Sequence, residues 1–143
     1  MMADSNAILR RGEADTRMAE NGSSNKAILI ANANFREGAG IRNSLEACGY
    51  EVSCWTDVTD ARDRLKVRNY EVVAFSTNIG PKGMDGLLED LRARKVPPKV
   101  ILIADEDEGD AASRCFLRTV VVVNRPFKIG EVADIVEHLI GAP

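Results

Sequence analysis

The chain has 143 residues, of which 45% are hydrophobic and 29% charged, and its formal net charge is -3 at pH 7. These values fit one globular domain and exclude a collagen-like repeat, a largely disordered chain and a disulfide-stapled miniprotein. The negative charge and the absence of a basic run argue against nucleic acid and anionic membranes as direct partners. No apolar stretch approaches the ~20 residues that cross a bilayer, and no signal peptide is recognised, so we expect a cytoplasmic protein.

The first 25 residues differ in character from the rest of the chain. A polar stretch from Asn21 to Asn25 reads as a linker, and charged side chains outnumber large apolar ones upstream of it. We expect residues 1–25 to form a flexible or partly helical tail, and residues 26–141 to form the domain.

From Lys26 onward, short β-branched runs alternate with segments of helical periodicity. Gly49 and Asn69 are expected to end the first two helices, and Gly38 and Gly40 to loosen the start of the first. The strands are predicted at 27–30, 51–55, 71–75, 100–103 and 120–123, and the helices around 41–48, 58–65, 87–91, 112–116 and 132–139.

Several of the predicted strands are apolar throughout, as strands are when helices cover both faces of a parallel sheet. Five βα units with right-handed crossovers predict an α/β protein with a flavodoxin-like, doubly wound sheet in the strand order 2-1-3-4-5. Such sheets carry their functional sites beyond the carboxyl ends of the strands. The residues that follow the first, third, fourth and fifth strands are therefore the candidates for function.

Three motifs in the expected order support a more specific interpretation. They are the helix and strand entry at 41–52, the sequence Gly83-Met84-Asp85-Gly86 after the third strand, and Arg125-Pro126-Phe127 after the fifth. With these motifs, residues 26–141 resemble the receiver domains of bacterial two-component response regulators, the CheY-like family. The resemblance implies a cis peptide bond before Pro126 and a signalling role.

The residues that perform phosphorylation in this family are replaced. The resemblance places Asn32 and Ala33 at the positions of the acidic pair that holds Mg²⁺, and Ser76 at that of the phosphate-accepting aspartate. Since Mg²⁺ requires hard anionic oxygens, we expect no metal, no other cofactor, no aspartyl phosphorylation and no enzymatic activity. The remaining positions are occupied by Ala104 for the hydroxyl residue, Arg125 for the phosphate-binding lysine and Val122 for the aromatic switch.

The leading hypothesis is a pseudo-receiver that acts by binding a protein partner or a second copy of itself. For this binding, family members commonly present the face formed by the fourth helix, the fifth strand and the closing helix. The only histidine is expected to be solvated on the edge of the closing helix rather than catalytic. The residues expected on this face are Phe116, Arg118, Val122, Glu131 and His138.

Two other functions remain open. A serine kinase could modify Ser76 or Thr77, which would place a phosphate beside Arg125. Alternatively, the crevice at the carboxyl ends of the strands could bind a small ligand as a sensor, although no catalytic dyad or phosphate loop supports this.

Two further groups of residues are interpreted as structural. The acidic run 105–110 lacks the ligand spacing of a calcium loop and is expected to be solvated. Cys48, Cys54 and Cys115 are interpreted as buried thiols, because a redox switch requires an exposed thiol of low pKa.

Overall fold

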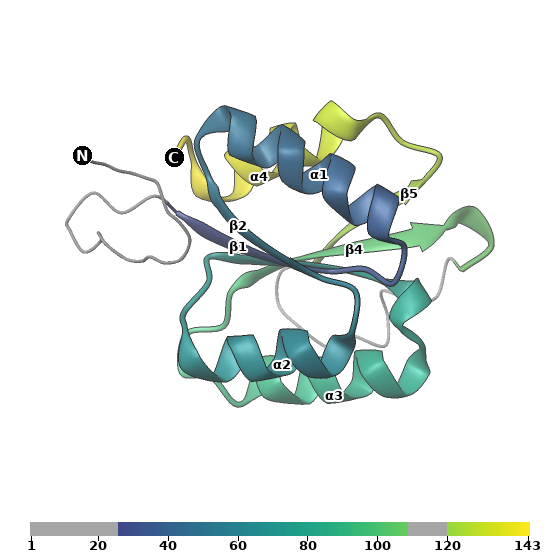
Figure 1. Ribbon diagram of the computed structural model, residues 1–143. Coiled ribbons are helices and arrows are strands. Elements are labelled where there is room, and N and C mark those ends of the chain that lie inside the picture. Colours follow the sequence, from purple (N-terminus) through teal and green to yellow (C-terminus); the bar gives the residue numbers. More distant parts are fainter. Residues whose placement is uncertain (1–25, 109–119) are drawn as a thin grey trace.

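The computed structural model describes residues 26–108 and 120–143 (Figure 1). The predicted tail and the predicted helix around 112–116 lie outside the described residues. The strands are β1 (Ala27–Ala31), β2 (Glu51–Trp55), β3 (Val72–Ser76), β4 (Lys99–Asp105) and β5 (Val120–Arg125). The helices are α1 (Phe35–Cys48), α2 (Val58–Val67), α3 (Pro81–Arg92) and α4 (Ile129–Ile140), with short 3-10 helices η3 (Thr77–Ile79) and η4 (Glu106–Glu108).

The five strands form one parallel sheet in the order β2-β1-β3-β4-β5, which confirms the predicted flavodoxin-like α/β fold. Helices α1 and α4 lie on one face of the sheet, and α2 and α3 lie on the other (Figure 1). The three inner strands are buried almost completely, because both of their faces are covered. Their side chains alternate between two hydrophobic cores, one under each helical layer.

Local signals explain where α1 begins and ends, with one correction. The Asn34 side chain accepts a hydrogen bond from the Glu37 N–H at 3.0 Å, and Gly49 ends the helix with a φ of 108°. Gly38 and Gly40 do not loosen the start, because both lie inside α1. Gly38 is buried, and a Cβ there would come within 2.9 Å of the Cys54 Sγ. The glycine therefore permits close packing of α1 against β2.

The predicted end of α2 is also corrected. The helix stops at Val67, and Arg68 already has extended backbone angles, so Asn69 is not the residue that ends it. Instead, the Asn69 side chain accepts a hydrogen bond from Arg94 in the loop after α3.

The two ends of the domain meet beside the amino end of β1. The Lys26 ammonium donates hydrogen bonds to the Ile140 carbonyl at 2.6 Å and to the Ala142 carbonyl at 2.9 Å. The Tyr50 hydroxyl donates to the Gly141 carbonyl at 2.7 Å. These bonds satisfy carbonyls at and beyond the end of α4, where no further helical turn can do so.

The carboxyl ends of β3, β4 and β5 extend further than predicted. The residues Ser76, Asp105 and Arg125 are the last residues of these strands. The parallel register pairs Ser76 with Ile103 and Asp105 with Arg125. The peptide bond between Arg125 and Pro126 is cis, as the resemblance implied. This register brings the candidate residues to one edge of the sheet.

We expect Leu87→Ala to lower the free energy of unfolding by about 2 to 5 kcal/mol, because the Leu87 side chain is fully buried between α3 and the sheet. Chemical denaturation followed by circular dichroism measures this loss. The matched control is Val67→Ala at a side chain that is 73% exposed, where we expect a change within about 0.5 kcal/mol. Equal losses in both variants would contradict the assigned core.

Candidate functional site

The candidate site lies beyond the carboxyl ends of β1, β3, β4 and β5. Asn32 directly follows β1 and Ser76 ends β3, and both side chains are fully buried. Ala33, in contrast, is exposed. Arg125 reaches into the site from the end of β5, with 22% of its side chain exposed. The structure therefore brings Asn32, Ser76 and Arg125 together, as the sequence predicted.

The Arg125 guanidinium is the centre of the site. Its Nε and one terminal nitrogen donate to the two Glu37 oxygens at 2.9 and 2.8 Å, which is a bidentate ion pair. A second contact joins Arg125 to the Asp105 carboxylate at 3.3 Å, and a third joins it to the Ser76 hydroxyl. The Arg125 guanidinium is thus already occupied by the protein's own carboxylates.

Although Asn32, Ala33 and Ser76 carry no carboxylate, two carboxylates from other positions enter the site. Glu37 comes from the first turn of α1 and Asp105 from the end of β4, so neither occupies a position at which the family places its acids. The sequence contains the pattern Asn34-x-x-Glu37, which is typical of a helix start and predicts only a capping role for the acid. No periodicity or spacing rule identifies Arg125 as its partner 88 residues away.

A network of amides holds the other half of the site. Asn32 donates to the Glu37 carboxylate at 2.8 Å, and its own oxygen accepts from the Asn78 amide at 2.8 Å and from the Asn34 N–H at 2.9 Å. The Ala33 N–H donates to the Asn78 oxygen at 2.8 Å. Asn32 is therefore satisfied at both ends of its amide and has a structural role in linking β1, η3 and α1.

These contacts change the acidity of the site. The hydrogen bond from Arg125 is the main cause that lowers the pKa of Glu37, and it outweighs the opposing effect of burial. The same bond raises the pKa of Arg125. The pKa of Glu108 is lowered by the Asp105 N–H first and by the Thr77 hydroxyl second. The ion pair is therefore fully charged at neutral pH.

The residues present do not fit the Mg²⁺ ion that the fold family implies. The Asn32 oxygen already accepts two hydrogen bonds, and Ala33 offers only a methyl group. The Glu37 carboxylate is paired with a guanidinium whose positive charge would repel a divalent cation. No chemical step through a metal is derived for this site.

An acidic cluster borders the site at η4. The side chains of Asp105, Asp107 and Glu108 bring carboxylate oxygens within 4.8 Å of one another. Two of them are already engaged, because Asp105 contacts Arg125 and Glu108 accepts from the Thr77 hydroxyl at 2.7 Å. These engagements favour the predicted solvated loop over a calcium site. Asp110 lies outside the described residues.

The switch positions and the predicted partner face are partly described. Ala104 is buried and Val122 is 38% exposed on the edge strand β5. Glu131 and His138 are exposed on α4, so the histidine is solvated as predicted. Phe116 and Arg118 lie outside the described residues, so the full face stays a prediction.

The cysteines divide into two environments. Cys48 is exposed at the end of α1, which corrects its assignment as a buried thiol. Cys54 is half-buried, and burial raises the pKa of its thiol, which makes it less reactive at neutral pH. Cys115 lies outside the described residues.

Solved structures of response-regulator receiver domains have a fold similar to that of this chain. A response regulator receiver domain from Methylobacillus flagellatus superposes with a TM-score of 0.67 at 20% identity, over 81% of this chain and 99% of the other. The chemotaxis response regulator CheY4 of Vibrio cholerae gives a TM-score of 0.69 at 13% identity, over 82% and 100% of the two chains. The chain has the CheY-like receiver fold.

A third structure agrees with this receiver fold. The receiver domain of the Francisella response regulator 1452 gives a TM-score of 0.66 at 22% identity, over 80% of this chain and 96% of the other. No protein-family model and no curated protein sequence matches the chain. In the described ranges of this receiver fold, no helix is long and apolar enough to cross a membrane.

We expect Glu37→Gln to lower the free energy of unfolding at pH 7 by about 1 to 3 kcal/mol, because it removes the charged partner of Arg125. The pair lowers the folded-state pKa of Glu37, so its contribution is full above the ordinary value of 4.5 and is lost as pH falls through the lowered value. Denaturation of both proteins between pH 7 and 3 should show the difference shrinking.

The control for this experiment is Glu46→Gln. Glu46 is an exposed helix acid that lies 3.9 Å from Arg42, so its removal should change stability by less than about 0.5 kcal/mol at any pH. A Glu37→Gln deficit that stayed constant down to pH 3 would show that the ion pair does not stabilise the site.

Proposed function

We propose that the chain is a pseudo-receiver, a signalling module that binds another protein without aspartyl phosphorylation and without Mg²⁺. The observation that carries the proposal is the ion pair between Arg125 and Glu37. In phosphorylated receivers the cation at this position binds the phosphoryl group, whereas here an internal carboxylate is permanently paired with it. The module is not an enzyme, because the site has neither an accepting carboxylate at position 76 nor a metal-binding acid pair.

The loss of the relay supports the same function. A receiver shifts between two states when a hydroxyl residue after the fourth strand and an aromatic residue on the fifth move toward the phosphate. Ala104 has no hydroxyl to move, and Val122 has no ring to rotate. The module therefore presents one constitutive surface. It acts in the bacterial cytoplasm as part of a two-component pathway.

The partner or a second copy binds the face formed by the predicted helix around residues 112–116, β5 and the closing helix α4. Among the described members of this face, Val122, Glu131 and His138 are all exposed. Val122 lies on the free edge of the sheet, where an apolar side chain gains most from being covered.

Modification of Ser76 or Thr77 is the second candidate. The contact between Arg125 and the Ser76 hydroxyl favours it, because arginine binds phosphate through its fork of donors. However, Ser76 is fully buried, so a kinase could reach it only after β3 had opened. The Thr77 hydroxyl faces the Glu108 carboxylate, which would repel a phosphate. A small-ligand sensor at this crevice has no comparable supporting contact.

Treatment with acetyl phosphate and Mg²⁺ tests the absence of phosphorylation. We expect the intact mass to stay unchanged, and we expect no shifts in backbone NMR spectra on addition of beryllofluoride and Mg²⁺. The reason is that Ser76 offers no carboxylate to accept the group and that Arg125 already engages the Glu37 carboxylate. A receiver with the complete acidic set, treated in parallel, serves as the positive control. A phosphorylated mass, or widespread shifts around residue 76, would end the proposal.

Substitution on the exposed face tests the binding role. The combined variant Val122→Asp, Glu131→Lys and His138→Ala should reduce recovery of the native partner in affinity capture by about tenfold or more. The control is Val67→Asp, which changes an exposed valine on α2 on the opposite side of the sheet. Equal recovery with both proteins would show that the partner binds elsewhere.

A further inference from the structure

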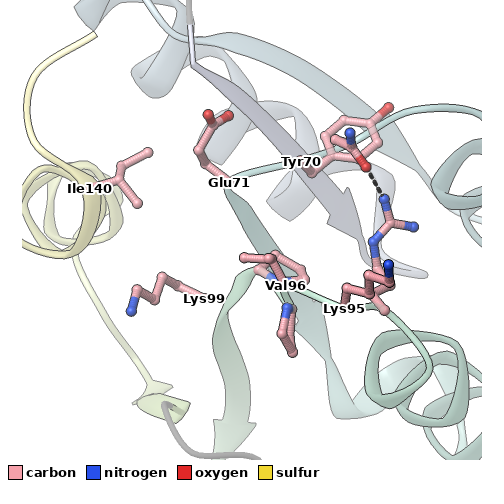
Figure 2. A pocket seen from close by; sticks show the side chains of 10 residues that line it. Tyr70, Glu71, Lys95, Val96, Lys99 and Ile140 are labelled. Carbon is pink, nitrogen blue, oxygen red and sulfur yellow. Dashed lines mark hydrogen bonds between the residues drawn. The ribbon is translucent and has the colours of Figure 1, made fainter.

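A pocket of about 750 Å³ opens at the amino ends of the strands, at the opposite end of the sheet from the candidate site. Figure 2 shows Val96 between Lys95 and Lys99, with Glu71 above it and Ile140 at the left, beyond Lys99. Val96 is 84% exposed, which is the largest exposure among the large apolar residues of the described ranges. The exposed Pro97 and the buried Pro98 also line the pocket.

The rim of this pocket carries positive charge without internal partners. Lys95 and Lys99 are exposed, and neither side-chain ammonium group makes an ion pair or a hydrogen bond within residues 26–108 and 120–143. Arg94 adds a third cation, although it donates to the Leu65 carbonyl at 2.8 Å and to Asn69. Glu71 is the single carboxylate on the pocket wall, and it accepts from the Ala27 N–H at 2.9 Å.

The other end of the sheet has the opposite character. Glu106 and Asp107 are exposed on η4, and their carboxylates have no hydrogen-bond partner in the described part of the chain. Phe35, on the first turn of α1, is 67% exposed. Arg125 contacts both Glu37 in that same turn and Asp105 at the start of the acidic run, so the phenylalanine and the carboxylates lie at one end.

We propose that this protein associates head to tail with a second copy of itself, with Phe35 of one copy seated in the pocket around Val96 of the next. Glu106 and Asp107 then face Lys95 and Lys99. An aromatic side chain in an apolar depression with charges around its rim is the usual composition of an interaction centre. This proposal goes beyond the proposed function, because its docking surface includes neither β5 nor the exposed α4 residues Glu131 and His138.

The positions of the two surfaces predict a head-to-tail assembly in which each contact leaves further binding surfaces free. β4 begins at the cationic Lys99 and ends at the anionic Asp105, so the two complementary surfaces lie at opposite ends of one strand. Such a heterologous contact leaves one free surface of each kind on every dimer and extends into a chain unless rotation closes a ring. Salt should weaken the contact, because its charges are exposed.

Sedimentation velocity of the full chain tests the proposal. We expect the sedimentation coefficient to rise between about 10 µM and about 1 mM protein at low ionic strength, and to return to the monomer value in about 0.5 M NaCl. Three variants should each weaken association by about tenfold or more, namely Lys95→Glu with Lys99→Glu, Glu106→Lys with Asp107→Lys, and Phe35→Ser.

Mixing separates a specific contact from a general effect of charge. The Lys95→Glu, Lys99→Glu protein retains an intact acidic end, and the Glu106→Lys, Asp107→Lys protein retains an intact pocket. The mixture should therefore associate although each protein alone does not. Lys82→Glu, which reverses one charge at an exposed residue outside the pocket, should leave association in place.

Circular dichroism and thermal melting show whether each variant is folded. A single monomeric species at every protein concentration and low salt overturns the proposal. Association that persists in both charge-reversal proteins also overturns it. So does a mixture of the two proteins that fails to associate.

Discussion

The ion pair between Arg125 and Glu37 determines which interactions are open to the site at the carboxyl ends of the strands. Both groups are mostly shielded from solvent, and two short hydrogen bonds join them. Removing either partner would leave a shielded charge without compensation, so the pair is strongly retained once formed. It also joins the first turn of α1 to the end of β5. The guanidinium at the carboxyl ends of the strands thus has its counter-anion built into the first helix.

Much of the fold follows from patterns that are local in the sequence. Apolar runs identified the five strands, and the periodicity of residues such as Leu87 and Val136 identified helices that the structure confirms. The errors lie at boundaries. Asn69 was expected to end α2, yet its side chain is held by Arg94 from another loop, and tertiary contacts of this kind leave no trace in a short window of sequence.

The site shows the same division between local and distant information. The resemblance correctly gathered Asn32, Ser76 and Arg125, because the motif positions are anchored to strand ends. It missed Glu37, since a carboxylate in the first turn of a helix is expected there for the helix's own stability. Only the folded chain shows that this side chain turns toward β5. Carboxylates are nevertheless present at the site, where Arg125 engages both Glu37 and Asp105.

Lys26 has a consequence for the architecture of the polypeptide as a whole. By binding the carbonyls of Ile140 and Ala142, it places the beginning and the end of the folded unit side by side. A few glycines would bridge this gap, so a circularly permuted protein opened in a surface loop should retain the same sheet. For the same reason, modules fused to both ends would emerge from a single corner and share one neighbourhood, which raises their effective concentration for each other.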